Sequence, residues 1–125
     1  WTDIVAISAG INHAVGLKKD GTVVAAGSSS SGQCNVGNWS DVVYIEAGCN
    51  GYTFAITSSG NVLSAGSNSN ANYNCDVSTW NDIVAIAADD FVVGLKSDGT
   101  FVFTGTDSDT KHPSEAELWT NVKLP

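Results

Sequence analysis

The sequence has few of the residues that bind nucleic acids, anionic membranes or metals. Its 125 residues hold five Lys and Arg against thirteen Asp and Glu, a formal net charge of −8. Nucleic acids and anionic membranes attract clustered basic side chains, so we expect neither as a partner. No apolar run approaches the roughly 18 residues of a membrane span, and the first residues do not form a signal peptide. The compartment, cytoplasmic or secreted, stays open.

Cysteine and histidine are equally scarce. Three widely spaced cysteines do not make a disulfide framework, and the sequence has no Cys-x-x-Cys pair. With only His13 and His112 as nitrogen ligands, we expect no zinc site and no cofactor. Cys34 and Cys75 hold the same place in neighbouring repeats, too far apart for a disulfide, so we expect free, mostly buried thiols.

Tryptophan marks an internal repeat with a period of about 40 residues. Each tryptophan leads a similar phrase: "WTDIVAI", "WSDVVYI", "WNDIVAI" and "WTNVKLP". Glycines recur in register behind these phrases. The repeat positions are Trp1, Trp39, Trp80, Trp119, Gly21, Gly60, Gly99, Gly27, Gly66 and Gly105. We therefore expect one repeat domain over 1–125, with units 1–38, 39–79 and 80–118 and a partial unit at 119–125.

The residues of each unit predict short β-strands. In the first unit, apolar runs at 3–7, 13–17 and 22–27 have strand length. The turn "KKDG" ends in a glycine that can take positive φ, which is typical of a hairpin. The segment 33–36 suits a short fourth strand. One helical turn is expected only at "PSEAELW" near the C-terminus.

This pattern predicts an all-β fold with two alternatives. Three propeller-type blades of antiparallel strands fit the period and the strand count. A β-trefoil also has three copies of about forty residues, but it has no place for the partial unit at 119–125.

The stretch "AGINHAVGLKKDGTVVAAGSSSSGQ" resembles a repeat of the regulator-of-chromosome-condensation family. The matching residues are Gly10, His13, Leu17, Asp20, Gly21, Gly27, Gly32 and Gln33. The later units carry Tyr52 and Phe91 in place of the histidine. The resemblance implies a β-propeller of four-stranded blades whose loops bind proteins. Since a full ring has more blades than three, the chain is either part of a longer array or a homo-oligomer that completes the propeller.

The candidate catalytic residues have simpler structural explanations. His13 shares its position with two aromatic residues, which indicates a packed ring rather than a ligand. The carboxylates at 88–90 and 106–110 lack the frame of a calcium loop, and the serines at 28–31 lack a histidine partner. The tryptophans are expected in the core between blades. No catalytic or metal site is predicted.

The sequence therefore predicts a non-enzymatic repeat module that binds a protein partner through variable loops. Loops that vary over a regular scaffold commonly carry recognition. The predicted contact residues are Ser30, Asn68, Tyr73, Asp107 and Asp109. The alternative is a lectin-like module that binds carbohydrate through aromatic and Asn-rich loops.

Overall fold

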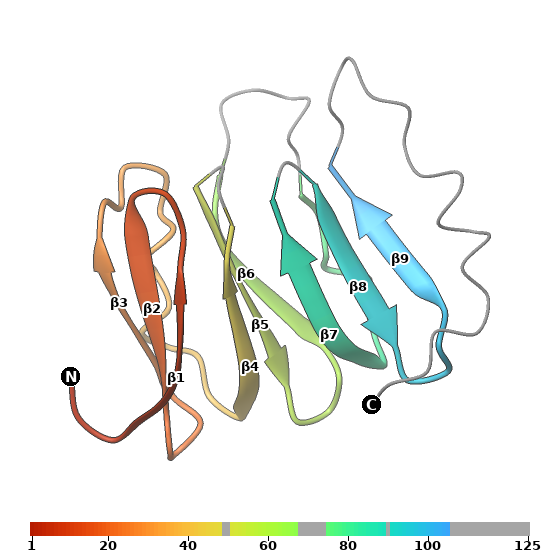
Figure 1. The fold of residues 1–125 in the computed structure, drawn as a ribbon, viewed down its shortest axis with the longest axis horizontal. Helices are drawn as coiled ribbons and strands as arrows, with labels where there is room; N and C mark the ends of the chain where they lie inside the picture. Colours follow the sequence, from red (N-terminus) through yellow and green to blue (C-terminus); the bar gives the residue numbers. More distant parts are fainter. Residues whose placement is uncertain (49–50, 68–74, 90, 106–125) are drawn as a thin grey trace.

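The computed structural model describes residues 1–48, 51–67, 75–89 and 91–105. These residues form three antiparallel sheets, which stand side by side from left to right in Figure 1. Each sheet contains three strands in chain order. The strands are β1 (Ile4–Ala9), β2 (His13–Lys18), β3 (Val23–Gly27), β4 (Val42–Ala47), β5 (Tyr52–Thr57), β6 (Val62–Gly66), β7 (Ile83–Ala88), β8 (Val92–Lys96) and β9 (Phe101–Thr104).

Each repeat unit makes its own sheet, which we call blade 1 (β1–β3), blade 2 (β4–β6) and blade 3 (β7–β9). The all-β class and the propeller-type blades predicted from the sequence are confirmed. The β-trefoil alternative is wrong, because the three strands of a unit pair with one another rather than across units.

The first strand of every blade begins with the same irregularity. A register shift interrupts the pairing between Ile4 and Ala6, and it recurs at the start of β4 and of β7. The residue before each strand is an aspartate with positive φ: 60° at Asp3, 57° at Asp41 and 58° at Asp82. Asp is among the few residues that tolerate this conformation, so the aspartate of the W-x-D phrase sets the entry into each blade.

The hairpin turns follow the prediction. Gly21, Gly60 and Gly99 end the second-to-third strand turns with φ of 81°, 83° and 86°. Their amides bond back to Lys18, Thr57 and Lys96. A side chain at these positions would be strained, which explains why glycine recurs there.

The segment 33–36 is not a strand. It forms successive turns, in which the Asn35 amide bonds the Gly32 carbonyl and the Val36 amide bonds the Cys34 carbonyl. The reason is packing, since Gln33, Val36 and Trp39 are buried between blades 1 and 2 instead of extending a sheet. The expected helical turn at 113–119 lies outside the described residues. Within the described residues there is no helix able to cross a membrane.

Two apolar clusters join the blades. The first lies between blades 1 and 2 and contains Val15, Leu17, Trp39 and Ile45. The second lies between blades 2 and 3 and contains Phe54, Ile56, Trp80 and Ile86. The rear face of blade 1 therefore covers the front face of blade 2, and the rear face of blade 2 covers the front face of blade 3.

Candidate protein-interaction surfaces

The edge at the top of Figure 1 carries the variable loops, and we call its described residues 10–12, 28–32, 51 and 67 the loop edge. The Ser28 amide donates to the Asn12 carbonyl at 2.8 Å, and Ser67 Oγ donates to the Ser31 carbonyl at 3.3 Å. Gly51 approaches the Ser31 side chain so closely that a Cβ there would lie 3.2 Å away. Loops of two different blades therefore form one continuous edge.

The serine segment at 28–31 has more internal structure than its composition suggests. The Gly32 amide bonds the Ser29 carbonyl, Ser29 Oγ accepts from the Cys34 amide, and Cys34 Sγ contacts the Ser28 carbonyl at 3.2 Å. Ser30 is exposed at the tip. Cys34 is consequently half-buried, whereas Cys75 is buried, and both thiols are free. Burial raises the pKa of the Cys75 thiol.

Ile11 is the large apolar residue of this edge, with 71% of its surface exposed. It directly precedes the loop residue Asn12, which bonds Ser28. Ile11 thus places an exposed apolar side chain on an otherwise polar edge, where a protein partner would bury it. Of the predicted contact residues, Ser30 lies on the described loop edge, while Asn68, Tyr73, Asp107 and Asp109 lie outside the described residues.

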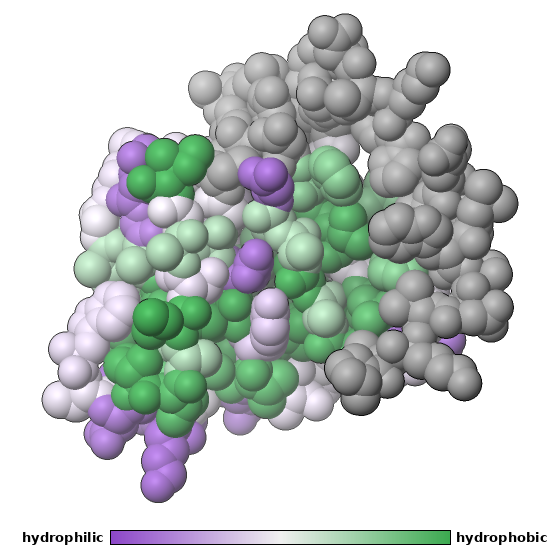
Figure 2. All heavy atoms as spheres, in the orientation of Figure 1, coloured by the Kyte–Doolittle hydropathy of each residue, from purple (hydrophilic) through white to green (hydrophobic). Residues whose placement is uncertain are grey.

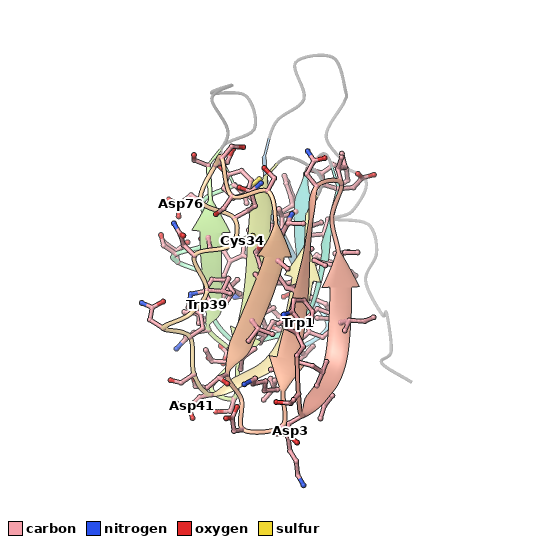
Figure 3. The ribbon with its side chains drawn as sticks, turned by 90° about the vertical axis from the view of Figure 1, so that its left-hand side faces the viewer. Trp1, Asp3, Cys34, Trp39, Asp41 and Asp76 are labelled. Carbon is pink, nitrogen blue, oxygen red and sulfur yellow. The ribbon has the colours of Figure 1, made fainter. Side chains whose placement is uncertain are left out.

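The opposite edge is regular. In blade 1 the Thr22 hydroxyl donates to Asp20 at 2.6 Å, and Thr100 bonds Asp98 in the same way in blade 3. These bonds lower the pKa of both aspartates. Figure 3 shows Asp3 and Asp41 together at this edge. The repeated geometry indicates a structural role rather than a variable recognition surface.

His13 is a structural residue in a contact between two blades. Its Nε2 lies 2.7 Å from Thr53 Oγ1, and the Thr53 hydroxyl donates to the Gln33 carbonyl at 2.7 Å. Because that hydroxyl proton is already donated, His13 Nε2 carries the proton and donates it to Thr53. Burial lowers the pKa of His13, which favours the neutral ring.

Glu46 joins the first strands of all three blades. Ser8 Oγ accepts a hydrogen bond from the Ala47 amide at 2.9 Å. The Glu46 carboxylate is hydrogen-bonded to the Ser8 hydroxyl and also accepts a hydrogen bond from the Ala88 amide. Burial raises the pKa of Glu46, and these two hydrogen bonds partly offset the shift. The described residues contain no group of three or more His, Cys, Asp or Glu able to hold a metal ion.

The tryptophans do not share one environment. Trp39 and Trp80 are 8% exposed and lie in the two clusters between blades, but Trp1 is 58% exposed. The expectation of a core position is therefore wrong for Trp1, because no described blade covers the front face of blade 1. Figure 3 shows Trp1 in front of the nearest sheet. Trp119 lies outside the described residues.

The three antiparallel sheets and the two apolar clusters that join them define the class of protein as a β-propeller-type array of blades. The match to a known family is local: residues 4–33 match the Regulator of chromosome condensation (RCC1) repeat. The resemblance expected from the first unit is thus confirmed. No significant match was found among curated proteins.

Solved propeller structures share the blade arrangement. The crystal structure of Prp20p from Saccharomyces cerevisiae, described with its binding to Gsp1p and histones, has a TM-score of 0.65 and 22% identity, covering 82% of this chain and 30% of that one. The structure of Kap60 bound to yeast RCC1 (Prp20) has a TM-score of 0.66 and 22% identity, covering 82% of this chain and 29% of that one. The CRINKLY WD40 ectodomain of the Arabidopsis thaliana receptor kinase ACR4 has a TM-score of 0.61 and 19% identity, covering 82% of this chain and 36% of that one. The chain therefore spans about a third of these proteins, and at such identities the likeness establishes the fold.

Proposed function

We propose that the chain is a non-enzymatic propeller-type module that binds another protein through its loop edge. The observation that carries the proposal is the convergence of variable loops from two blades on one edge, which also carries the exposed side chain of Ile11. The opposite edge repeats the same turns. Recognition is expected where loops differ over a constant scaffold.

The placement of the candidate catalytic and sugar-binding residues supports this choice. His13 is bonded within the contact between blades 1 and 2, and Trp39 and Trp80 are buried between blades. Trp39 and Trp80 therefore cannot stack on a sugar ring, which counts against the carbohydrate alternative at these two positions.

The solved relatives are consistent with a protein partner, since Prp20p is described with Gsp1p and histones and in complex with Kap60. Our chain has a net charge of −8, which favours a partner surface that is neutral or basic.

The test compares two exposed serines on opposite edges in a pull-down from source lysate. We expect Ser30→Arg and Ile11→Asp to weaken retention of the partner by about tenfold or more, because each places charge in the contact. Ser59→Arg, at the regular edge, is the matched control and should retain it. Equal retention by all variants, or no specific partner for the unmodified chain, would overturn the proposal.

A further inference from the structure

Blade 2 ends on one side in an unpaired strand. Its strand order is β4-β5-β6, and within the described residues β6 pairs with β5 alone. The two faces of this blade pack in the two apolar clusters, against blade 1 and against blade 3. The open side of this sheet is therefore an edge rather than a face, and we call the free side of β6 the outer edge.

The register shows which backbone groups the outer edge presents. The Thr57 amide donates to the Asn61 carbonyl at 2.9 Å at the start of the β5–β6 ladder. Since bonded and non-bonded pairs alternate along an antiparallel ladder, Leu63 bonds β5, whereas Val62 and Ser64 stand in non-bonded pairs. The N–H and C=O groups of Val62 and Ser64 therefore point away from β5, where the described part of the chain supplies no hydrogen-bond partner.

The inner edge, formed by the first strands β4 and β7, is treated differently. The Ala47 amide of β4 donates to Ser8 Oγ at 2.9 Å, and the Ala88 amide of β7 donates to the Glu46 carboxylate. Figure 2, seen from the side of the first strands, shows apolar side chains over much of the described part of this face. Side chains of the neighbouring blade thus satisfy the inner-edge amides, and the outer edge of β6 has no such cap among the described residues.

The sequence of β6 also lacks the features that keep strand edges apart. Its residues, VLSAG, include no charged residue and no proline, and its register with β5 is continuous. Natural edge strands are commonly protected by charges, prolines or bulges. The edge strand β4 of the same blade has two of these features, Glu46 and a register shift between Val42 and Tyr44. Ser64, in the middle of β6, is exposed.

We infer that the outer edge of β6 binds an extended segment of another polypeptide, which adds a fourth strand to blade 2. Unpaired N–H and C=O groups at strand spacing are complementary to the backbone of an extended chain, which bonds them in pairs. Because β6 is uncharged, the segment that fits best is itself uncharged and rich in β-branched residues. This contact uses residues other than those of the loop edge.

Amide hydrogen exchange of the full chain, followed by NMR, tests whether the edge is open. We expect the Ser64 amide to exchange at least about a hundredfold faster than the Leu63 amide of the same strand, because Leu63 bonds β5 and Ser64 does not. Leu63 is the matched control for the stability of the strand itself. Equal protection of the two amides would mean that the outer edge is already paired and would overturn the inference.

A phage-displayed library of linear nine-residue peptides tests binding. Ser64→Pro removes the outward amide without removing a ladder bond to β5, so it should weaken binding of the selected peptides at least about tenfold. Ser64→Thr keeps that amide and should stay within about threefold. Ser30→Arg should leave the binding unchanged, which separates this contact from the proposed loop-edge partner.

The bound peptide should also slow exchange of the Ser64 amide at least about tenfold, a readout that decides the question even if Ser64→Pro does not fold. Circular dichroism verifies the folding of each variant. Peptides that bind folded Ser64→Pro and the unmodified chain equally, or that leave Ser64 unprotected, overturn the inference. Self-association that Ser64→Pro abolishes, measured by sedimentation velocity, would give the edge to a second copy of the chain and overturn it as well.

Discussion

The two contacts between blades use the same positions but different chemistry. Between blades 1 and 2, His13 and Thr53 form a buried hydrogen bond that continues to the Gln33 carbonyl. Between blades 2 and 3, the corresponding positions hold Tyr52 and Val92, both buried in an apolar cluster. Tyr52 and Phe54 stack there with ring centroids 5.8 Å apart.

The comparison shows that the blade scaffold fixes where a contact forms but not which interaction fills it. A buried polar group is tolerated at the first contact because each of its partners is satisfied. At the second contact, larger aromatic side chains take the same space. Gly94 lets the Trp80 ring lie close to the strand at this contact, as a Cβ there would lie 2.7 Å from the ring.

Among the substitutions that test this comparison, Gly94→Ala, at the contact between blades 2 and 3, should lower the stability of the fold the most. The new methyl group would overlap the Trp80 ring, which is enclosed by blades 2 and 3, so we expect a loss of about 2–3 kcal/mol in the free energy of unfolding. Urea denaturation measures it.

Gly16→Ala is the matched control at the corresponding position of blade 1. The methyl group would meet Trp1 at 3.0 Å, but Trp1 is 58% exposed and can move. The expected change is below about 0.5 kcal/mol in the monomer. Equal losses in the free energy of unfolding for Gly94→Ala and Gly16→Ala would show that Trp80 and Trp1 are equally restrained.

Thr53→Val should have the next largest effect. It keeps the shape of the side chain but leaves His13 Nε2–H and the Gln33 carbonyl without their partner, so we expect a loss of about 1–2 kcal/mol. Thr53→Ser preserves the hydroxyl and should recover most of that loss in the same denaturation experiment. If Val is as stable as Ser at this position, the hydrogen-bond chain does not stabilise the contact.

The pH dependence of stability should show the smallest effect. Burial lowers the pKa of His13 below its ordinary value of 6.5, so the unfolded chain binds this proton more readily than the folded one. The contribution of neutral His13 to the free energy of unfolding is therefore complete above pH 6.5 and decreases as the pH falls below that value. His13→Phe, which copies the residue of the third unit, should remove this part of the slope between about pH 5 and 7. An unchanged slope would contradict the assignment.

Much of the fold was predictable because the repeat makes each local pattern visible three times. The strands, the positive-φ glycine turns and the all-β class follow from spacing and apolar runs. The prediction of a fourth strand at 33–36 was wrong, since the choice between strand and turn depends on burial of Gln33 and Val36 against a second blade. The RCC1-type repeat was recognisable in the first unit, where most of the motif residues are present.

The functional surfaces were less accessible to sequence reasoning. Variable loops could be recognised, but not that Asn12, Ser28, Ser31 and Ser67 would be tied together along one edge. Ile11 was not chosen as a contact residue, although it is the large apolar residue in a short polar turn, and that contrast was the available signal. The buried link from His13 to Thr53 joins residues 40 positions apart, a distance that no local pattern reveals.

The sequence by itself determined the blade, because alternating apolar residues, aspartate entries and glycine turns act within one unit. Only the tertiary structure decided the environment of each repeated side chain. Trp1 and Trp39 begin nearly identical phrases, yet one is exposed and the other buried, because burial depends on the face that a neighbouring blade presents.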